Sequence, residues 1–75
     1  EEGIYPFWMK DMLFSIDIIW IDSDRKVVDI APDVAPETYP TTFSPSTPAQ
    51  YVLEMAAGSV ERLDIHRGDE ILMKF

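Results

Sequence analysis

One segment constrains the fold of this 75-residue chain more than any other: residues 13–22, which read LFSIDIIWID. Large apolar side chains occur at Ile16, Ile18 and Trp20, and the positions between them hold Asp17 and further isoleucines. Successive side chains of a strand point to opposite faces, so this segment carries apolar side chains on both. The pattern predicts a central strand that is covered on both sides.

The rest of the chain predicts further strands and one short helix. A polar turn and Val27–Ile30 follow the central strand and complete a β-hairpin. Ser59 is the expected N-cap of a helix of one or two turns, with Val60 and Leu63 facing inward. The other expected strands are 5–10, 50–55 and 70–75. We therefore expect residues 1–75 to form a single small domain of the α+β or mostly β class, with a barrel-like mixed sheet of four to five strands.

A loop rich in Pro, Thr and Ser is expected at residues 32–48, because five of the six prolines lie there. Proline donates no backbone hydrogen bond and moves its predecessor out of the α region, so neither a helix nor a central strand fits this segment. Tyr39 and Phe43 suggest that the loop packs against the body of the domain. It is either a recognition element for a partner or a crossover that shields a sheet edge.

Composition excludes several classes of function. Fourteen acidic and six basic residues give a net charge of −8, which disfavours binding to nucleic acid. The chain has no cysteine, one histidine and no glycine-rich phosphate loop, so we expect no cofactor, zinc site or Ser-His-acid triad. No apolar run is long enough to span a bilayer.

The residues with most chemical promise are Lys10 and Asp17, which are ionisable but lie within strongly apolar strands. Buried charges are costly unless they are paired, so a pair of Lys10 with Asp17 or Asp11 that fixes strand register is one interpretation. The alternative is a ligand pocket with an apolar wall from Phe7 and Trp8. The candidate ligand-binding residues are Phe7, Trp8, Lys10, Asp11, Asp17 and Tyr39.

Two other groups of residues have a functional and a structural interpretation. Asp22 and Asp24 are weak candidates for a calcium site, but Arg25 and Lys26 follow them, and acids that solvate a hairpin turn explain the pattern better. His66 precedes an Arg-Gly-Asp sequence and is expected to be a surface turn residue, since Gly-Asp is common in turns.

Several segments together resemble the domain-of-unknown-function family 192. They are Phe7-Trp8-Met9-Lys10-Asp11, Leu13–Asp22, the block Pro48-Ala49-Gln50-Tyr51-Val52-Leu53-Glu54-Met55 with Ala57-Gly58, and Ile65–Asp69. The chain departs from the family pattern at Asp11-Met12, where the family has Asn-Thr, and at Arg25, where it has a hairpin glycine.

The resemblance implies a small barrel-like β domain without established catalytic residues, in a protein that is secreted or membrane-anchored and thus extracytoplasmic. The family domain begins with an earlier strand, so 1–75 would be its C-terminal two-thirds. An open sheet edge would then be filled by another chain, which predicts self-association.

Together these observations predict a non-enzymatic module that binds a small ligand or a protein partner through Trp8, Lys10 and the Pro-rich loop. The alternatives are a purely structural module and a hydrolase in which Asp17 is the general base and Lys10 its electrostatic partner. The hydrolase requires burial to raise the pKa of Asp17 toward neutrality.

Overall fold

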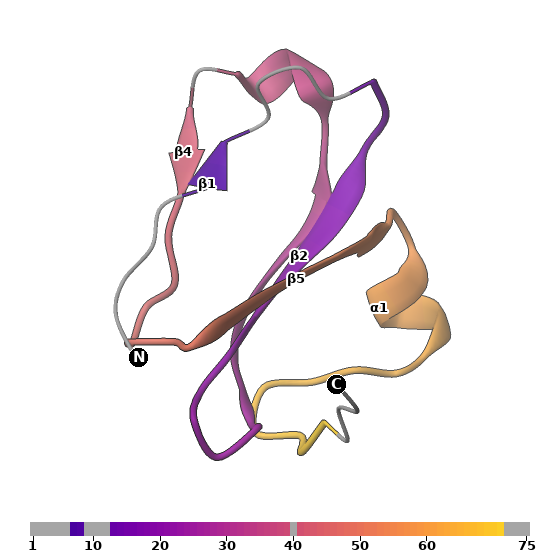
Figure 1. The fold of residues 1–75 in the computed structure, drawn as a ribbon. Helices are drawn as coiled ribbons and strands as arrows, with labels where there is room; N and C mark the ends of the chain where they lie inside the picture. Colours follow the sequence, from indigo (N-terminus) through magenta and orange to yellow (C-terminus); the bar gives the residue numbers. More distant parts are fainter. Residues whose placement is uncertain (1–6, 9–12, 40, 72–75) are drawn as a thin grey trace.

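The computed structural model describes residues 7–8, 13–39 and 41–71, and in this part the protein consists mostly of β-strands (Figure 1). The elements in chain order are β1 (Phe7–Trp8), β2 (Ile16–Ile21), β3 (Val27–Val34), the 3-10 helix η1 (Pro36–Thr38), β4 (Thr42–Phe43), β5 (Tyr51–Ala56) and α1 (Ser59–Arg62). The prediction of a β-rich domain with one short helix is confirmed. None of the helices in these ranges is long and apolar enough to cross a membrane.

Strand β2 is the centre of the main sheet, as its sequence predicts. It lies between β3 and β5 and pairs antiparallel with both. All six of its residues are buried. Ile16, Ile18 and Trp20 belong to one apolar cluster, and Ile19 and Ile21 belong to a second one. The two-sided burial of β2 is therefore confirmed.

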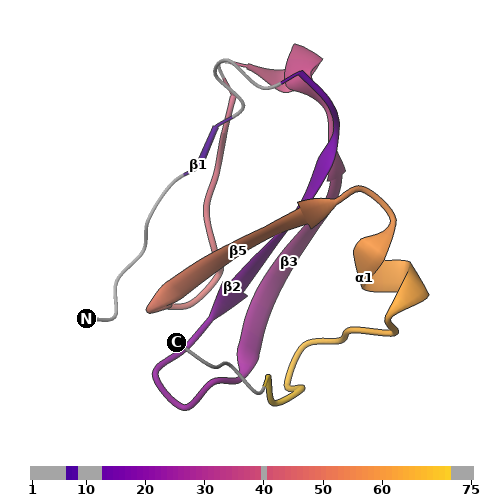
Figure 2. The same ribbon diagram turned by 45° about the vertical axis from the view of Figure 1, so that its right-hand side comes forward.

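Different parts of the chain cover the two faces of this sheet. Figures 1 and 2 show α1 on one side and the β1–β4 pair on the other. On the α1 side, Val60, Ile65 and Ile71 pack against the cluster of Ile19 and Ile21. On the other side, the buried Ala49 and the half-buried Phe43 contribute to the cluster that contains Trp20.

The sheets differ in detail from the expected mixed, barrel-like sheet. Within the described ranges, β3, β2 and β5 form a three-stranded sheet, and β1 pairs separately with β4. All of these strand pairs are antiparallel, and both sheets are open. In the expected closing strand, Glu70 forms an isolated bridge with Lys26, and residues 72–75 lie outside the described residues. Strand β5 is at an edge of the three-stranded sheet. Self-association through an open edge stays a prediction.

The Pro-rich segment 32–48 has more regular structure than its composition predicts. Strand β3 continues through Pro32 to Val34, and η1 and β4 follow. Proline is accommodated in β3 because β3 is an edge strand with a register shift at this point, where a backbone N–H is not needed for the ladder. Phe43 packs against the core, which confirms that the segment folds back on the domain.

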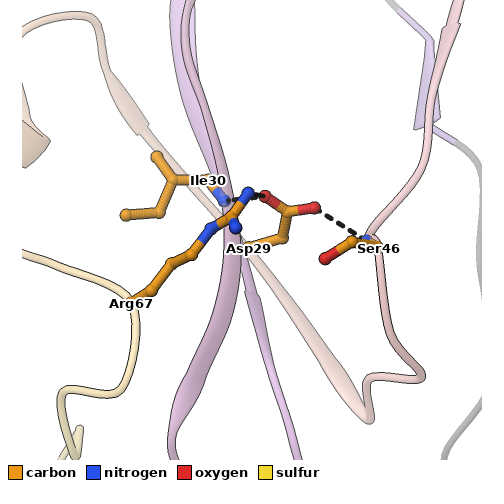
Figure 3. Close-up of polar contacts among 4 residues, drawn as sticks. All are labelled: Asp29, Ile30, Ser46 and Arg67. Carbon is orange, nitrogen blue, oxygen red and sulfur yellow. Dashed lines mark hydrogen bonds and ion pairs between the residues drawn. The ribbon is translucent and has the colours of Figure 1, made fainter.

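A buried carboxylate in β3 joins two loops to the sheet (Figure 3). Asp29 is 8% exposed and accepts hydrogen bonds from the Ser46 backbone N–H at 2.7 Å and from Arg67 Nη2 at 2.6 Å. Burial by itself would raise the pKa of Asp29, but the hydrogen bonds, led by those from the Ser46 and Ile30 N–H groups, outweigh burial and lower it. Arg67 of the Arg-Gly-Asp sequence thus has a structural partner.

The central position of β2 makes its stability contribution testable. Ile19→Ala is expected to lower the free energy of unfolding by about 2–5 kcal/mol, because Ile19 is fully buried and truncation leaves a cavity. Leu53→Ala is the matched control, since Leu53 pairs with Ile19 from the edge strand but is 38% exposed. Urea unfolding measures both. Equal losses in the two variants would contradict the assignment of β2 as the central strand.

Candidate functional site

The acidic side chain in the middle of the apolar β2 segment is fully engaged by backbone donors. Asp17 is 1% exposed. Its Oδ1 accepts a hydrogen bond from the Asp33 N–H at 2.8 Å, and its Oδ2 accepts one from the Val60 N–H at 2.9 Å. These donors belong to β3 and α1, so one carboxylate connects three elements that are distant in sequence.

These hydrogen bonds determine the charge state of Asp17. Burial by itself would raise the pKa of this carboxyl, but four backbone N–H groups outweigh burial and hold the pKa below its usual range; they belong to Val60, Asp33, Gly58 and Ser59. Asp17 is therefore a carboxylate at neutral pH. A general base in a hydrolase needs a raised pKa, and this condition is not met.

Asp17 also takes the place of a helix cap. The prediction that Ser59 caps the helix is wrong: the N-cap is Gly58, with φ of 92° and no side-chain capping bond. A capping side chain normally accepts a hydrogen bond from the second or third residue of the helix. Here the acceptor for Val60, the second residue of α1, is Asp17 of strand β2. Leu63, predicted to face inward, is 53% exposed because α1 ends at Arg62.

The bonding to Asp33 depends on an irregularity in β3. The register between β2 and β3 shifts between the pairs Ile16–Val34 and Ile18–Ala31, so β3 holds one extra residue there. Asp33 lies in this bulge with φ of 51°, a left-handed conformation that Asp tolerates better than most residues. The bulge directs the Asp33 N–H to Asp17 instead of to the ladder.

A pocket of about 600 Å³ lies where these elements meet. Its lining combines apolar residues with acidic side chains and the single histidine; the residues are Asp17, Pro32, Asp33, Ala57, Gly58, Val60, Glu61, Asp64, Ile65 and His66. The size is within the range of roughly 300–1,000 Å³ that is typical of small-molecule sites. Asp17 holds the surrounding backbone in place and has both oxygens occupied.

The charge of the pocket is negative. Asp33, Glu61 and Asp64 are exposed carboxylates, and no Lys or Arg is among the lining residues. His66 Nε2 lies 3.3 Å from Asp64 Oδ1, and its Nδ1 lies 3.9 Å from Asp69 Oδ2. Among the described residues there is no group of three or more His, Cys, Asp and Glu side chains arranged to hold a metal ion. Acidic side chains therefore predominate among the charged lining residues.

The structure describes the side chains of two of the six predicted ligand-binding residues, Asp17 and Tyr39. Of these two, Asp17 lines the pocket and Tyr39 is not among its lining residues, so the grouping of the six stays a prediction. Tyr39 follows η1 and is 37% exposed. Phe7 and Trp8 form β1, of which the structure gives the backbone pairing with β4, and Lys10 and Asp11 lie outside the described residues. The proposed pairs of Lys10 with Asp17 or Asp11 thus stay predictions.

The two weak metal candidates belong to the β2–β3 turn. Asp22 Oδ1 accepts hydrogen bonds from the N–H groups of Asp24 and Lys26, both at 2.9 Å. This is the usual way in which an Asp side chain stabilises a turn. Arg25 has φ of 64°, a conformation that glycine adopts more readily, and it stands where the family pattern has a glycine.

Sequence reasoning missed most of the pocket residues. Asp33, Glu61 and Asp64 read as ordinary surface acids, because acidic residues are frequent throughout the chain. They approach one another only through the bulge in β3 and the attachment of α1 to Asp17. The available signal was Asp17 itself, an acid in an apolar strand that required a buried partner.

Replacing the Asp17 carboxylate is expected to destabilise the domain. Asp17→Asn retains one acceptor oxygen and turns an NH₂ group toward the remaining backbone donor, so we expect a loss of about 2–3 kcal/mol in the free energy of unfolding. Asp24→Asn, in the exposed hairpin turn, is the control and should change stability by less than about 0.5 kcal/mol. Urea unfolding at pH 7 measures both, and equal stability of the two variants would refute the role of Asp17.

The lowered pKa values of Asp17 and Asp29 predict an acid-sensitive fold. Their stabilisation is complete above the unfolded-state pKa of about 3.9 and is lost as the pH falls through the lower folded-state pKa. The unfolding free energy should therefore fall on acidification below about pH 4–5. The fall should be shallower in Asp17→Asn. Urea unfolding between pH 6 and pH 2.5 measures the slopes, and the same slope in both proteins would contradict the lowered pKa of Asp17.

Comparison with solved structures shows that this fold occurs in longer proteins. A protein from Sinorhizobium meliloti 1021, whose description proposes a role as a transcription regulator, superposes with a TM-score of 0.87 and 31% identity over 93% of this chain and 54% of its own. A protein of unknown function from Novosphingobium aromaticivorans DSM 12444 gives a TM-score of 0.85 and 33% identity over 92% of this chain and 49% of its own.

Comparison of sequences gives relatives in archaea. The UPF0127 protein TK1120 of Thermococcus kodakarensis is 38% identical over 60 residues, and a UPF0127 protein of Thermococcus gammatolerans is 40% identical over 60 residues. Each match covers 80% of this chain, but the chain spans only 36–37% of the length of these relatives. The family model DUF192, described as uncharacterized ACR, COG1430, matches residues 1–73. The chain therefore belongs to the DUF192 family, whose function is unknown.

Proposed function

We propose that this domain is a binding module whose ligand occupies the pocket beside α1. The observation that carries the proposal is the pocket of about 600 Å³, in which apolar and charged side chains lie together. Binding sites combine an apolar lining with a few polar groups that orient the ligand, and this pocket has that composition.

The buried carboxylate supports this proposal because it makes the pocket a defined structure. Asp17 attaches the β3 bulge and the first turn of α1 to the central strand, and these two segments form opposite parts of the lining. A pocket that is fixed before the ligand arrives avoids the entropic cost of ordering its walls on binding.

Two other functions have less support. A hydrolase with Asp17 as general base conflicts with the lowered pKa of Asp17 and with the occupation of both its oxygens. Regulation of transcription, proposed for the Sinorhizobium meliloti protein, would require contact with DNA if this domain carried it out directly. The net charge of −8 counts against such contact.

A ligand screen followed by blockage of the pocket tests the proposal. Small amines, carboxylates, sugars and nucleotides are screened by ¹H–¹⁵N correlation spectroscopy, and a ligand is expected to shift the amide signals of Asp33 and Val60. Ala57→Trp should weaken the binding of that ligand at least tenfold, because Ala57 lines the pocket and is exposed, so that a large side chain fills the space without disturbing the core.

Ala56→Trp is the matched control for this experiment. Ala56 is the exposed neighbour of Ala57 and does not line the pocket, so the affinity should stay unchanged. A ligand that shifts only signals of residues 41–48, none of which lines the pocket, or one that binds Ala57→Trp as tightly as the unchanged protein, would overturn the proposal.

A further inference from the structure

The exposed carboxylates that line the pocket are an excess of negative charge, which no Lys or Arg among the described residues neutralises. Asp33 and Glu61 have no ion-pair partner among the described residues, and Asp64 pairs there only with the exposed His66. The chain as a whole has a net charge of −8. Carboxylates that surround a pocket without a cation of their own favour a positively charged ligand and repel an anionic one.

Four of the lining residues are apolar and suit an aliphatic chain. Pro32, Ala57, Val60 and Ile65 contribute this surface. Long cationic side chains bury their methylene groups against apolar surface while the charged group stays with polar partners. A cation with an aliphatic stem, such as an alkylammonium or alkylguanidinium group, therefore matches both parts of the lining.

Exposed apolar side chains next to the pocket indicate that this cation belongs to a protein. Leu13 is 91% exposed and Phe14 is 63% exposed. The next residue, Ser15, accepts a hydrogen bond from the N–H of Ala57, which lines the pocket. Leu63 is 53% exposed and directly precedes the lining residue Asp64. A free amine would leave these side chains in water, whereas a protein surface would cover them.

We propose that the pocket receives a lysine or arginine side chain of a protein partner, whose apolar residues cover Leu13, Phe14 and Leu63. This inference rests on the proposed function and names its ligand. The charged group lies among the carboxylates of Asp33, Glu61 and Asp64, and the stem lies along Val60 and its apolar neighbours.

Titration with short peptides tests the inference. The probes are capped pentapeptides of sequence Leu-Ala-Xaa-Ala-Leu, in which Xaa is Lys, Arg, norleucine or Glu, and spermidine serves as a free amine. Titrations are run at pH 8 and are followed by the amide signals of the pocket. The Lys and Arg peptides should bind at least fivefold more tightly than the norleucine peptide, and the difference should shrink in 0.5 M salt.

Variants separate the contributions of charge and apolar surface. The double variant Glu61→Gln and Asp64→Asn should abolish the preference for the Lys peptide over the norleucine peptide. Asp22→Asn is unsuitable as a control, because the Asp22 side chain stabilises a turn. Asp24→Asn, which removes an exposed charge outside the pocket, should retain the preference. Phe14→Ser should weaken the peptides at least threefold and leave spermidine unchanged.

Each contrary result has a distinct meaning. Equal binding of the norleucine and Lys peptides at the pocket would overturn the cationic ligand and leave the binding module intact. Tighter binding of spermidine than of every peptide, unaffected by Phe14→Ser, would overturn the protein partner in favour of a free polyamine. If none of these probes and no compound of the wider screen shifts the pocket signals, the proposed function itself fails.

Discussion

The structure depends on the burial of one carboxylate in the central strand. Asp17 lies between isoleucines that form the core, where an unpaired charge would cost several kcal/mol. Backbone N–H groups of the β3 bulge and of the first turn of α1 compensate for that cost, and both segments are thereby fixed to β2. Asp29 has the same role at the edge strand, where it joins the Ser46 and Arg67 segments to the sheet. A chain without cysteine thus uses two buried carboxylates as cross-links between distant segments.

The fold could be predicted where the pattern of apolar residues decides it. Large apolar side chains at both odd and even positions of Ile16–Ile21 predict a strand that is covered on both faces. Both faces of β2 are covered in the structure. The capping of α1 could not be predicted, because the acceptor is remote in sequence: Asp17 and Val60 are 43 residues apart. The pocket could not be predicted for the same reason, because its lining comes from the bulge at Asp33 and from α1, which Asp17 brings together.

The hydrogen bonds of Asp17 explain why this buried acid does not have the raised pKa that the hydrolase alternative requires. An acid that accepts several backbone hydrogen bonds is held as a carboxylate, and both oxygens of Asp17 accept such a bond. The proposed cationic ligand depends instead on the charge of the exposed carboxylates that line the pocket. The chain covers 54% and 49% of the two solved structures to which it is similar.

The Asp17 carboxylate accepts hydrogen bonds from the β3 bulge and from α1 at the same time. A pH titration of the amide proton chemical shifts tests this most directly, because an N–H that donates to a carboxylate shifts when that carboxylate is protonated. The amide protons of Asp33 and Val60 should shift together, with one common midpoint below the usual pKa of an aspartate. Separate midpoints, a midpoint in the usual range or no shift at either amide would contradict it.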